Sequence, residues 1–306
     1  MNDPGSAYCG RFAPSPTGSL HFGSLVAALG SYLEARSRHG RWLVRMDDLD
    51  GPRCSPAAAD AILRTLEACA LHWDGEIVWQ AGRTAAYAGA FERLKDAELL
   101  YPCSCTRREL ADSAIAADGS ARYPGTCRDG LPPGRAARAW RVRVGDAVVA
   151  FDDAVQGRVA SVLADDAGDF ILLRADGLFA YQLAVVVDDA EAHVTHIVRG
   201  ADLLPSTPRQ IFLQQCLGLP TPAYAHLPVA VNADGEKLSK QTLAVPVDAG
   251  RPGPALHAAL VFLGQHPPPE LAGAPPQDIL AWAVANWHLA RVPRGPLPAV
   301  PATVVG

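Results

Sequence analysis

The sequence predicts an α/β fold built on a doubly wound, Rossmann-like parallel sheet. An apolar stretch at 8–13 runs into the proline-rich turn 14–18, and a long helical pattern separates it from a second apolar stretch at 42–46. A strand, a helix and a second strand in this order form a βαβ unit, in which the two strands are parallel. Ligands of such sheets bind at the carboxyl ends of the strands, so the turn at 14–18 is a candidate site.

Helical periodicity defines the other elements of residues 8–100, the first half of the predicted sheet domain. Apolar residues recur at helical spacing over about 20–39, with Ser19 as the expected N-cap and a glycine after the last turn. Two further helices are expected at about 56–70 and 85–99.

The rest of the chain divides into four expected segments. Residues 101–165 lose the helical period and are rich in Gly, Pro, Cys and Arg, which indicates an insertion. Residues 166–245 return to the sheet domain, residues 246–292 form a short helical appendix, and residues 293–306 form a proline-rich tail. The elements expected in them are strands at 170–173 and 194–198, a strand or apolar core segment at 180–187, and helices at 208–217, 254–264 and 277–290.

The composition is that of a globular protein from a reducing compartment. With 306 residues, 49% of them hydrophobic, the chain can form a sizeable core, and charges interrupt its apolar runs before a membrane-spanning length of about 20 residues. The N-terminus lacks the basic and apolar regions of a secretory signal. Seven cysteines form an odd and scattered set, which argues against a disulfide framework. We therefore expect a cytoplasmic protein that is a monomer and has no membrane partner.

Positive charge is concentrated in one region, although the net charge of −5 does not suggest a nucleic-acid-binding protein. Six arginines and a single acid, Asp129, lie between positions 122 and 143. Such a stripe can bind a phosphate backbone even on an acidic protein, and a solvated loop with an exposed strand would have the same composition. The six arginines are Arg122, Arg128, Arg135, Arg138, Arg141 and Arg143.

The motif Lys237-Leu238-Ser239-Lys240 stands out because it holds two of the three lysines in the chain. The third is Lys95, and the remaining basic side chains are arginines. Lysine is a compact and mobile point charge, whereas arginine is a rigid fork, so a site that must follow shifting phosphates favours lysine. A solvated surface loop is the simpler explanation of the motif if it stands alone.

A second motif, His21-Phe22-Gly23-Ser24, marks the start of the first expected helix. Prolines stiffen the preceding turn, and Gly18 and Gly23 remove side chains where a nucleotide would approach the backbone. A helix N-terminus offers unpaired N–H groups and partial positive charge to an anion, and His21 can donate to a phosphate oxygen. Together with the lysine motif this pattern predicts ATP binding, whereas alone it could be a helix-start histidine without function.

The two motifs together resemble those of class I aminoacyl-tRNA synthetases, and the stretch 11–18, Tyr181 and Arg199-Gly200 resemble the glutamyl branch. The resemblance implies that ATP and glutamate form glutamyl-adenylate and pyrophosphate, with Mg²⁺ accompanying the ATP. It implies as catalytic residues His21, Lys237 and Lys240, which would stabilise charge at the α-phosphate. Ser24 stands where the usual motif has a second histidine. The implied ATP-binding residues are Gly18, His21, Gly23, Ser24, Lys237, Leu238, Ser239, Lys240 and Gln241.

The same resemblance implies a pocket for L-glutamate. Arg11 and Arg199 could pair with its carboxylates, and Asp47 would face its ammonium group. The family usually has glutamate at this position, so the shorter Asp47 leaves open how strictly the pocket selects glutamate over aspartate. Without the motifs, Arg199 would be interpreted as part of a strand-end salt bridge and Tyr181 as a core residue. The implied glutamate-binding residues are Arg11, Phe12, Ala13, Pro14, Ser15, Asp47, Tyr181 and Arg199.

Three cysteines of the expected insertion form a candidate zinc site. Cys103, Cys105 and Cys127 lie within 25 residues, and zinc prefers four ligands. No histidine lies in this stretch, so Tyr123 is the best fourth ligand; a water, or three reduced cysteines without metal, are the alternatives. The set resembles a Cys-x-Cys…Tyr-x3-Cys site of glutamylating enzymes, and this resemblance implies one structural Zn²⁺ bound by all four side chains.

The number of residues after the lysine motif indicates which RNA group would accept the glutamyl group. A glutamyl-tRNA synthetase carries a large helical anticodon-binding region there, but only about 66 residues follow Lys240. The chain therefore resembles the shortened glutamyl-queuosine tRNA(Asp) synthetases, which activate glutamate without tRNA and esterify it to queuosine at the wobble position of tRNA(Asp). Unstacked anticodon-loop bases are open to such recognition. The alternatives are a compact synthetase that charges a tRNA 3′ end, a nucleotidyltransferase relative, and a zinc-dependent RNA-binding protein with a decayed site.

Overall fold

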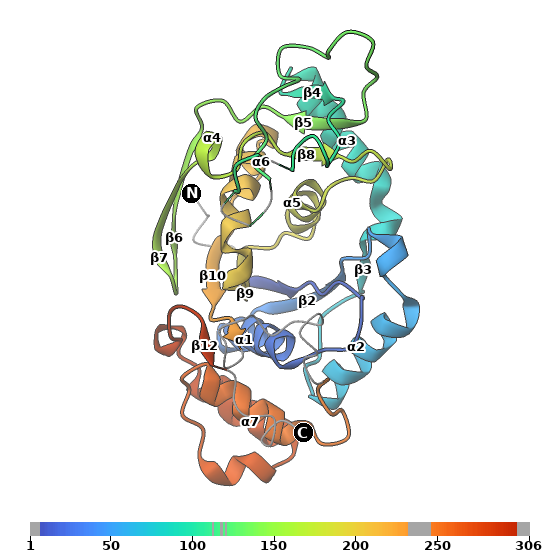
Figure 1. Ribbon diagram of the computed structural model, residues 1–306. Helices are drawn as coiled ribbons and strands as arrows, with labels where there is room; N and C mark the ends of the chain where they lie inside the picture. Colours follow the sequence, from blue (N-terminus) through green and yellow to red (C-terminus); the bar gives the residue numbers. More distant parts are fainter. Residues whose placement is uncertain (1–6, 112, 117–118, 120, 232–245, 299–306) are drawn as a thin grey trace.

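A parallel sheet crosses the middle of the molecule, with helices on both of its faces (Figure 1). The computed structural model describes residues 7–111, 113–116, 119, 121–231 and 246–298. One group of parallel strands has the order β1 (Cys9–Phe12), β2 (Arg41–Met46) and β3 (Val78–Trp79). A second group has the order β7 (Gly157–Val162), β6 (Val148–Asp153), β10 (Ala223–Leu227) and β9 (His196–Gly200).

The two groups of strands meet where β1 lies beside β9. The backbone N–H of Thr195, just before β9, donates to the carbonyl oxygen of Cys9 over 2.9 Å. After β1, the strands β2 and β3 are added toward one edge of the sheet. After β9, the strand β10 is added toward the opposite edge. The doubly wound parallel sheet predicted from the sequence is therefore confirmed, and its switch point lies between β1 and β9.

Each face of the sheet has its own helices and its own apolar core. On one face lie α1 (Phe22–Ser37) and α2 (Pro56–Ala68), and on the other lie α3 (Thr84–Asp96), α5 (Tyr181–Glu191) and α6 (Thr207–Leu217) (Figure 1). Successive side chains of a strand point to opposite faces, so Val198 joins the core around α1 and its neighbour Ile197 joins the core around α5.

A glycine allows α1 to lie close to the sheet. A Cβ atom at Gly30, in the middle of α1, would lie 2.5 Å from Cδ1 of Leu227 at the end of β10. A side chain at this position would force the side chain of Leu227 to move, so glycine allows the helix to pass closely over the end of the strand with Leu227 in place. The close contact brings the start of α1 to the carboxyl end of the sheet.

The structure corrects two expectations about helices. The first helix begins at Phe22, and its N-cap is His21 rather than Ser19, with Nδ1 of His21 accepting from the backbone N–H of Ser24 over 3.4 Å. A ring nitrogen of His21 thus takes the place of the side-chain oxygen that usually accepts a hydrogen bond from an N–H group of the first turn. The segment 180–187, expected as a strand or apolar core, is instead the start of α5. Residues 183–189 are all buried, so no polar face marks the helical period in the sequence.

The segment 101–165 contributes to two sheets. β4 (Leu100–Cys103), β5 (Ala139–Val142) and β8 (Ile171–Leu173) form a small antiparallel sheet, which α3 contacts. The hairpin of β6 and β7, followed by the short α4 (Leu163–Asp166), instead joins the main sheet, where Asp153 pairs with Tyr224 of β10. The segment therefore begins in the small sheet and ends as an edge of the main sheet.

Most arginines of the basic stripe bind partners within the protein. Arg122 pairs with Asp165, Arg128 with Asp169 and Arg135 with Glu109. Of the others, Arg141 is buried, and the guanidinium of Arg143 lies 4.7 Å from the centre of the Tyr101 ring. Arg141 therefore has a structural role, whereas the ion pairs of Arg122, Arg128 and Arg135 are weak because these side chains are partly exposed.

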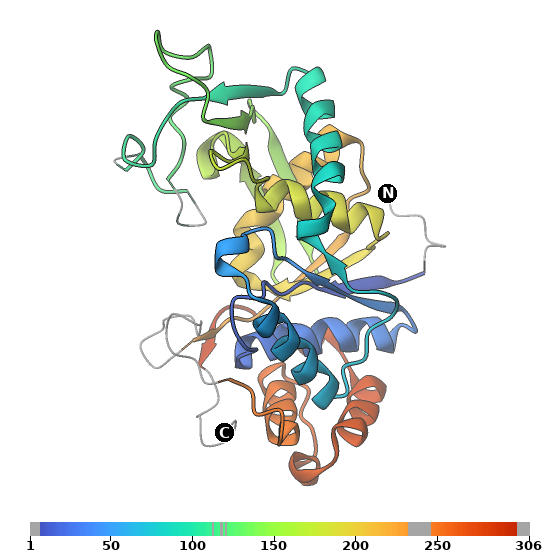
Figure 2. The same ribbon diagram turned by 90° about the vertical axis from the view of Figure 1, so that its right-hand side faces the viewer.

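The C-terminal appendix packs beneath α1 (Figure 2). It consists of α7 (Pro252–Phe262) and α8 (Pro276–Asn286), both expected from the sequence. Nε1 of Trp287 donates to the buried carboxylate of Glu34 over 2.6 Å, which ties the appendix to α1. Strand β11 (Ala230–Val231), which precedes the appendix in the chain, pairs with β12 (Leu297–Pro298), which follows it. The short 3₁₀ helices of the chain are η1 (Gly51–Arg53), η2 (Gln80–Arg83), η3 (Ala201–Ser206), η5 (Pro269–Gly273) and η6 (Leu289–Arg291).

None of the helices in the described part of the chain has both the length and the apolar character needed to span a membrane.

Candidate active site

A pocket of about 350 Å³ lies at the switch point, where β1 and β9 end. Its walls come from the turn after β1, the start of α1, the start of α5, the end of β9, and the residues after β10. Ten residues expected to bind glutamate or ATP line it: Arg11, Phe12, Ala13, Pro14, Ser15, His21, Gly23, Ser24, Tyr181 and Arg199. Gly18 and Asp47 are not part of the lining.

The start of α1 presents the histidine motif to this pocket. His21, Gly23 and Ser24 line the pocket, and Nε2 of His21 lies 3.1 Å from the hydroxyl oxygen of Ser24. The N–H groups of a first helical turn and the helix dipole both favour an anion at this place. The helix start can therefore hold a phosphate group, with the imidazole and the hydroxyl as side-chain donors.

The chain enters and leaves the lysine motif beside the same pocket. Val229 and Ala230, which precede the motif, line the pocket. After it, Pro246 pairs with His21, and the N–H of Val247 donates to the carbonyl oxygen of Leu20 over 2.9 Å. The expected residues Lys237, Leu238, Ser239, Lys240 and Gln241 lie outside the described residues.

Arg199 is a buried arginine that forms no ion pair with any carboxylate of the described residues. Its side chain lines the pocket from the end of β9 and is 4% exposed. Nη2 donates to Oγ1 of Thr207 and to Oε1 of Gln210, both over 2.8 Å, and Nε donates to Nε2 of His226 over 3.1 Å. Nη1 is buried without a hydrogen-bond partner. Since a buried unpaired charge is costly, this arrangement is suited to an incoming carboxylate.

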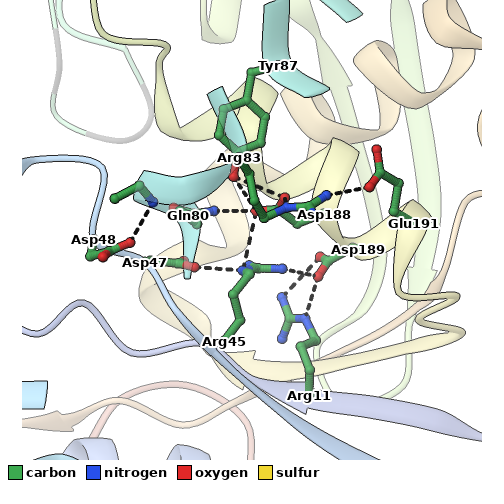
Figure 3. A network of polar contacts seen from close by, with 11 residues as sticks. Arg11, Arg45, Asp47, Asp48, Gln80, Arg83, Tyr87, Asp188, Asp189 and Glu191 are labelled. Carbon is green, nitrogen blue, oxygen red and sulfur yellow. Dashed lines mark hydrogen bonds and ion pairs between the residues drawn. The ribbon is translucent and has the colours of Figure 1, made fainter. Parts of the chain in front are cut away.

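Arg11, in contrast, already has a partner in the protein. Its Nε lies 3.2 Å from Oδ1 of Asp189 and its Nη2 lies 3.4 Å from Oδ2, while Nη1 of Arg45 lies 2.6 Å from the same Oδ1 (Figure 3). Burial works to raise the pKa of Asp189, but the two arginines outweigh burial and hold that pKa below its usual range. The charge of Arg11 is thus balanced by the protein, whereas no carboxylate of the described residues forms an ion pair with Arg199.

Asp188 organises the contacts on the other side of α5 (Figure 3). Its carboxylate accepts from the amide of Gln80 over 2.7 Å, from Nε of Arg83 over 2.6 Å and from the hydroxyl of Tyr87 over 2.9 Å. These bonds tie α5 to η2 and α3. Because α5 begins at Tyr181 in the pocket wall, the bonds also hold this wall in place.

Asp47 lies next to this network rather than in the pocket lining. It binds Nε of Arg45 over 2.7 Å, and Nη2 of Arg45 is buried without a hydrogen-bond partner. Burial raises the pKa of Asp47, although Arg45 opposes the rise. Burial also raises the pKa of Tyr181, which keeps its phenol neutral at the pocket wall. A contact between Asp47 and an ammonium group stays a prediction.

The cysteines expected to bind zinc converge in the structure. The Sγ atoms of Cys103, Cys105 and Cys127 all lie within 4.8 Å of one another. The hydroxyl oxygen of Tyr123 is 3.5 Å from Sγ of Cys103 and 3.7 Å from Sγ of Cys105. Thiolates bound about 2.3 Å from a tetrahedral zinc lie about 3.8 Å apart, close to the 3.7 Å between Cys105 and Cys127. The donor set therefore fits a tetrahedral Zn²⁺ with little rearrangement.

These features define a class of enzyme. A doubly wound sheet whose switch point has a pocket lined by a helix start and by arginines agrees with the catalytic architecture of class I tRNA synthetases. Residues 9–253 match the family "tRNA synthetases class I (E and Q), catalytic domain". A crystal structure of glutamate-tRNA synthetase from Elizabethkingia anophelis shares this fold, with a TM-score of 0.79 and 22% sequence identity over 98% of this chain and 69% of that chain.

Curated relatives indicate the branch of this family to which the chain belongs. A glutamyl-Q tRNA(Asp) synthetase of Aromatoleum aromaticum is 62% identical over 96% of this chain and 93% of its own length. Another, of Dechloromonas aromatica, is 60% identical over 99% of this chain and 100% of its own length. The chain therefore belongs to the glutamyl-Q tRNA(Asp) synthetases within the class I tRNA synthetases.

Sequence reasoning missed the residues that support the pocket from behind. Asp189 and His226 bind the pocket arginines, Arg45 and Asp153 bind Asp189 and His226 in turn, and none of these four residues belongs to a motif. A charged pair at the end of an apolar run, as at 188–189, was the available signal, because a charge among buried residues needs a partner.

Proposed function

We propose that the protein activates L-glutamate with ATP, independently of tRNA, and transfers the glutamyl group to queuosine at the wobble position of tRNA(Asp). The observation that carries the first step is the buried Nη1 of Arg199, which faces no carboxylate of the described residues and is suited to the side-chain carboxylate of glutamate. The name of the relatives at 60–62% identity supports tRNA(Asp) as the acceptor.

In the proposed activation step, the α-carboxylate of glutamate attacks the α-phosphorus of ATP, and pyrophosphate leaves. The first turn of α1 and His21 would bind phosphate oxygens, and Lys237 and Lys240 would neutralise the charge that develops on them. Mg²⁺ bound with ATP would supply further charge neutralisation. Ser24, Gly23 and Gly18 would complete the nucleotide site, together with Leu238, Ser239 and Gln241.

The glutamate would lie between Arg199 and the turn that follows β1. Tyr181 and the segment 11–15 would form the walls of this part of the pocket, and Asp47 would act on the ammonium group from behind them. In the transfer step, a hydroxyl of the acceptor attacks the acyl carbon of the adenylate, and AMP leaves. An unstacked anticodon base can enter a pocket of this kind directly.

Zinc would be bound by Cys103, Cys105, Cys127 and Tyr123. Its proposed role is structural, because the apolar cluster around these residues is small and a metal can add folding free energy to such a region. The zinc site would hold the end of β4 against the loop that contains Tyr123 and Cys127.

The acceptor is tested by labelling. The enzyme is incubated with ATP, Mg²⁺ and labelled glutamate, using tRNA from queuosine-containing and queuosine-deficient cells. Label on tRNA(Asp) only when queuosine is present supports the proposal. Equal labelling of both preparations would support a compact synthetase that charges the 3′ end. Adenylate formation without labelled tRNA would indicate another acceptor.

A further inference from the structure

We propose that Asp153 and His226 act as a positioning pair that fixes the guanidinium of Arg199 for its carboxylate ligand. Asp153 ends β6, His226 lies in β10, and Arg199 lies in the neighbouring β9. The three side chains are buried, with exposed fractions of 4%, 0% and 4%. The inference rests on the proposed function only in taking glutamate as the ligand of Arg199.

The carboxylate of Asp153 is fixed by the backbone around it. Oδ1 accepts from the N–H groups of Val155, Gln156 and His226, over 3.0, 2.8 and 3.1 Å. These bonds leave Oδ2 for the imidazole, and Oδ2 lies 2.6 Å from Nδ1 of His226. The carboxylate can therefore not rotate or exchange its two oxygens without losing three hydrogen bonds.

The tautomer of His226 follows from this geometry. A carboxylate oxygen accepts a hydrogen bond, so Nδ1 of His226 carries the proton and Nε2 has a lone pair. Nε2 lies 3.1 Å from Nε of Arg199, and that N–H can donate only to a lone pair. Asp153 thus sets the tautomer that makes His226 an acceptor for Arg199.

The pair fixes the orientation of the Arg199 guanidinium in the pocket lining. Nε is bound to His226, and Nη2 is bound to Thr207 and Gln210, whereas the buried Nη1 has no hydrogen-bond partner. An arginine held at two of its three nitrogens has little freedom left to lose when it binds a carboxylate. Because Asp153 begins the turn of the hairpin β6–β7, this hairpin supports the substrate pocket from outside it.

The decisive variant is Asp153→Asn. Oδ1 must stay an oxygen because three N–H groups point at it, so the new NH₂ group faces Nδ1 of His226. The amide then donates to Nδ1, so the proton of His226 moves to Nε2. The Nε2–H group and the N–H of Arg199 are both donors, so the hydrogen bond between them is lost. Asp152→Asn is the matched control, because Asp152 is the exposed neighbour on β6 whose carboxylate pairs with the exposed Arg158.

The test is glutamate-dependent ATP–pyrophosphate exchange. For Asp153→Asn we expect the KM for glutamate to rise about tenfold or more, with the KM for ATP and kcat changed much less. His226→Leu should have a similar effect, and His226→Gln a smaller one, because an amide oxygen can accept from Nε of Arg199. An unchanged KM for glutamate in folded Asp153→Asn and His226→Leu, or a KM increase just as large in Asp152→Asn, would overturn the proposal.

A second measurement does not depend on the substrate. In the wild-type protein, ¹⁵N NMR of the histidine rings should show His226 as the Nδ1–H tautomer, and Asp153→Asn should convert it to the Nε2–H tautomer. An Nε2–H tautomer in the wild type would overturn the positioning role, whatever the activity. Wild-type protein that shows the expected tautomer but no exchange with glutamate would instead contradict the proposed function.

Discussion

Arg11 and Asp189 form a buried ion pair in which Nε and Nη2 of the arginine lie 3.2 and 3.4 Å from the two oxygens of the carboxylate. The pair joins the end of β1 to α5 across the switch point, and Arg45 binds the same carboxylate. The two arginines expected to recognise glutamate therefore differ in their partners. Asp189 balances the charge of Arg11, whereas no carboxylate of the described residues balances the charge of Arg199. Of the two arginines that line the described part of the pocket, only Arg199 therefore has no carboxylate partner among the described residues.

Asp189→Asn should destabilise the protein. The substitution leaves Arg11 and Arg45 buried with one carboxylate fewer, which costs about 3 kcal/mol of unfolding free energy. Denaturant unfolding measures the loss, with Glu92→Gln as a control because Glu92 forms only an exposed pair with Lys95. Equal stability of the two variants would contradict a structural role for Asp189.

Arg199→Lys should raise the KM for glutamate while leaving the KM for ATP almost unchanged. Lysine keeps the charge but loses the fork that binds His226, Thr207 and Gln210 together. We expect a loss of about tenfold to a hundredfold in kcat/KM for glutamate, measured by pyrophosphate exchange. A variant with wild-type kinetics would remove Arg199 from the glutamate site.

The KM for glutamate should rise at acidic pH, as the pH falls through the lowered pKa of His226. Burial lowers the pKa of His226, with Arg199 adding to this effect and Asp153 opposing it, so His226 is neutral at pH 7. Besides these groups, Arg11 lies near enough to disfavour a charged ring, and Tyr224 stacks on the ring from the same strand. Protonation at Nε2 removes the acceptor for Nε of Arg199, so the neutral form is the one that supports binding.

The sign of this dependence is fixed by the lowered pKa. Neutral His226 predominates above its lowered folded-state pKa, so its hydrogen bond to Arg199 is lost only as the pH falls through that pKa. Kinetic profiles between pH 5 and about 8 check it. His226→Gln cannot titrate, so its profile should be flatter on the acid side, and superimposable profiles would contradict the assignment.

Lys240→Ala should reduce glutamate-dependent pyrophosphate exchange by about a hundredfold or more, because the lysine would stabilise charge at the phosphates in the transition state. Lys95→Ala is the natural control, since Lys95 is an exposed residue of α3 that pairs with Glu92. Exchange at the wild-type rate in Lys240→Ala would exclude a catalytic role for this lysine.

Cys127→Ser should lower the zinc content of the purified protein, measured by elemental analysis, because one of the converging thiols is lost. A chelator should lower the melting temperature of the wild type and change that of the variant much less. Cys216→Ser, a cysteine of α6 outside the cluster, serves as the control. A full complement of zinc in Cys127→Ser would indicate a different set of ligands.

The sequence alone determined the βαβ unit, the helix-start motif at 21–24 and the spacing of Cys103, Cys105 and Cys127. These features are local: a helical period, a capping position and a short cysteine spacing are encoded by residues close together in the chain. The four strands expected at 8–13, 42–46, 170–173 and 194–198, most bounds of the expected helices and the converging thiols are found in the structure.

Only the tertiary structure decided which charges compensate one another. Asp189 lies 178 residues from Arg11, and His226 lies 73 residues from Asp153, so no local pattern predicts their contacts. The same holds for α5, whose helical period is hidden because it is buried on every side over 183–189. Burial makes an unpaired charge costly, and packing alone decides which partner is within reach. For this reason the sequence indicated the pocket and its two arginines, and only the fold shows that Asp189 pairs with Arg11 while no carboxylate of the described residues pairs with Arg199.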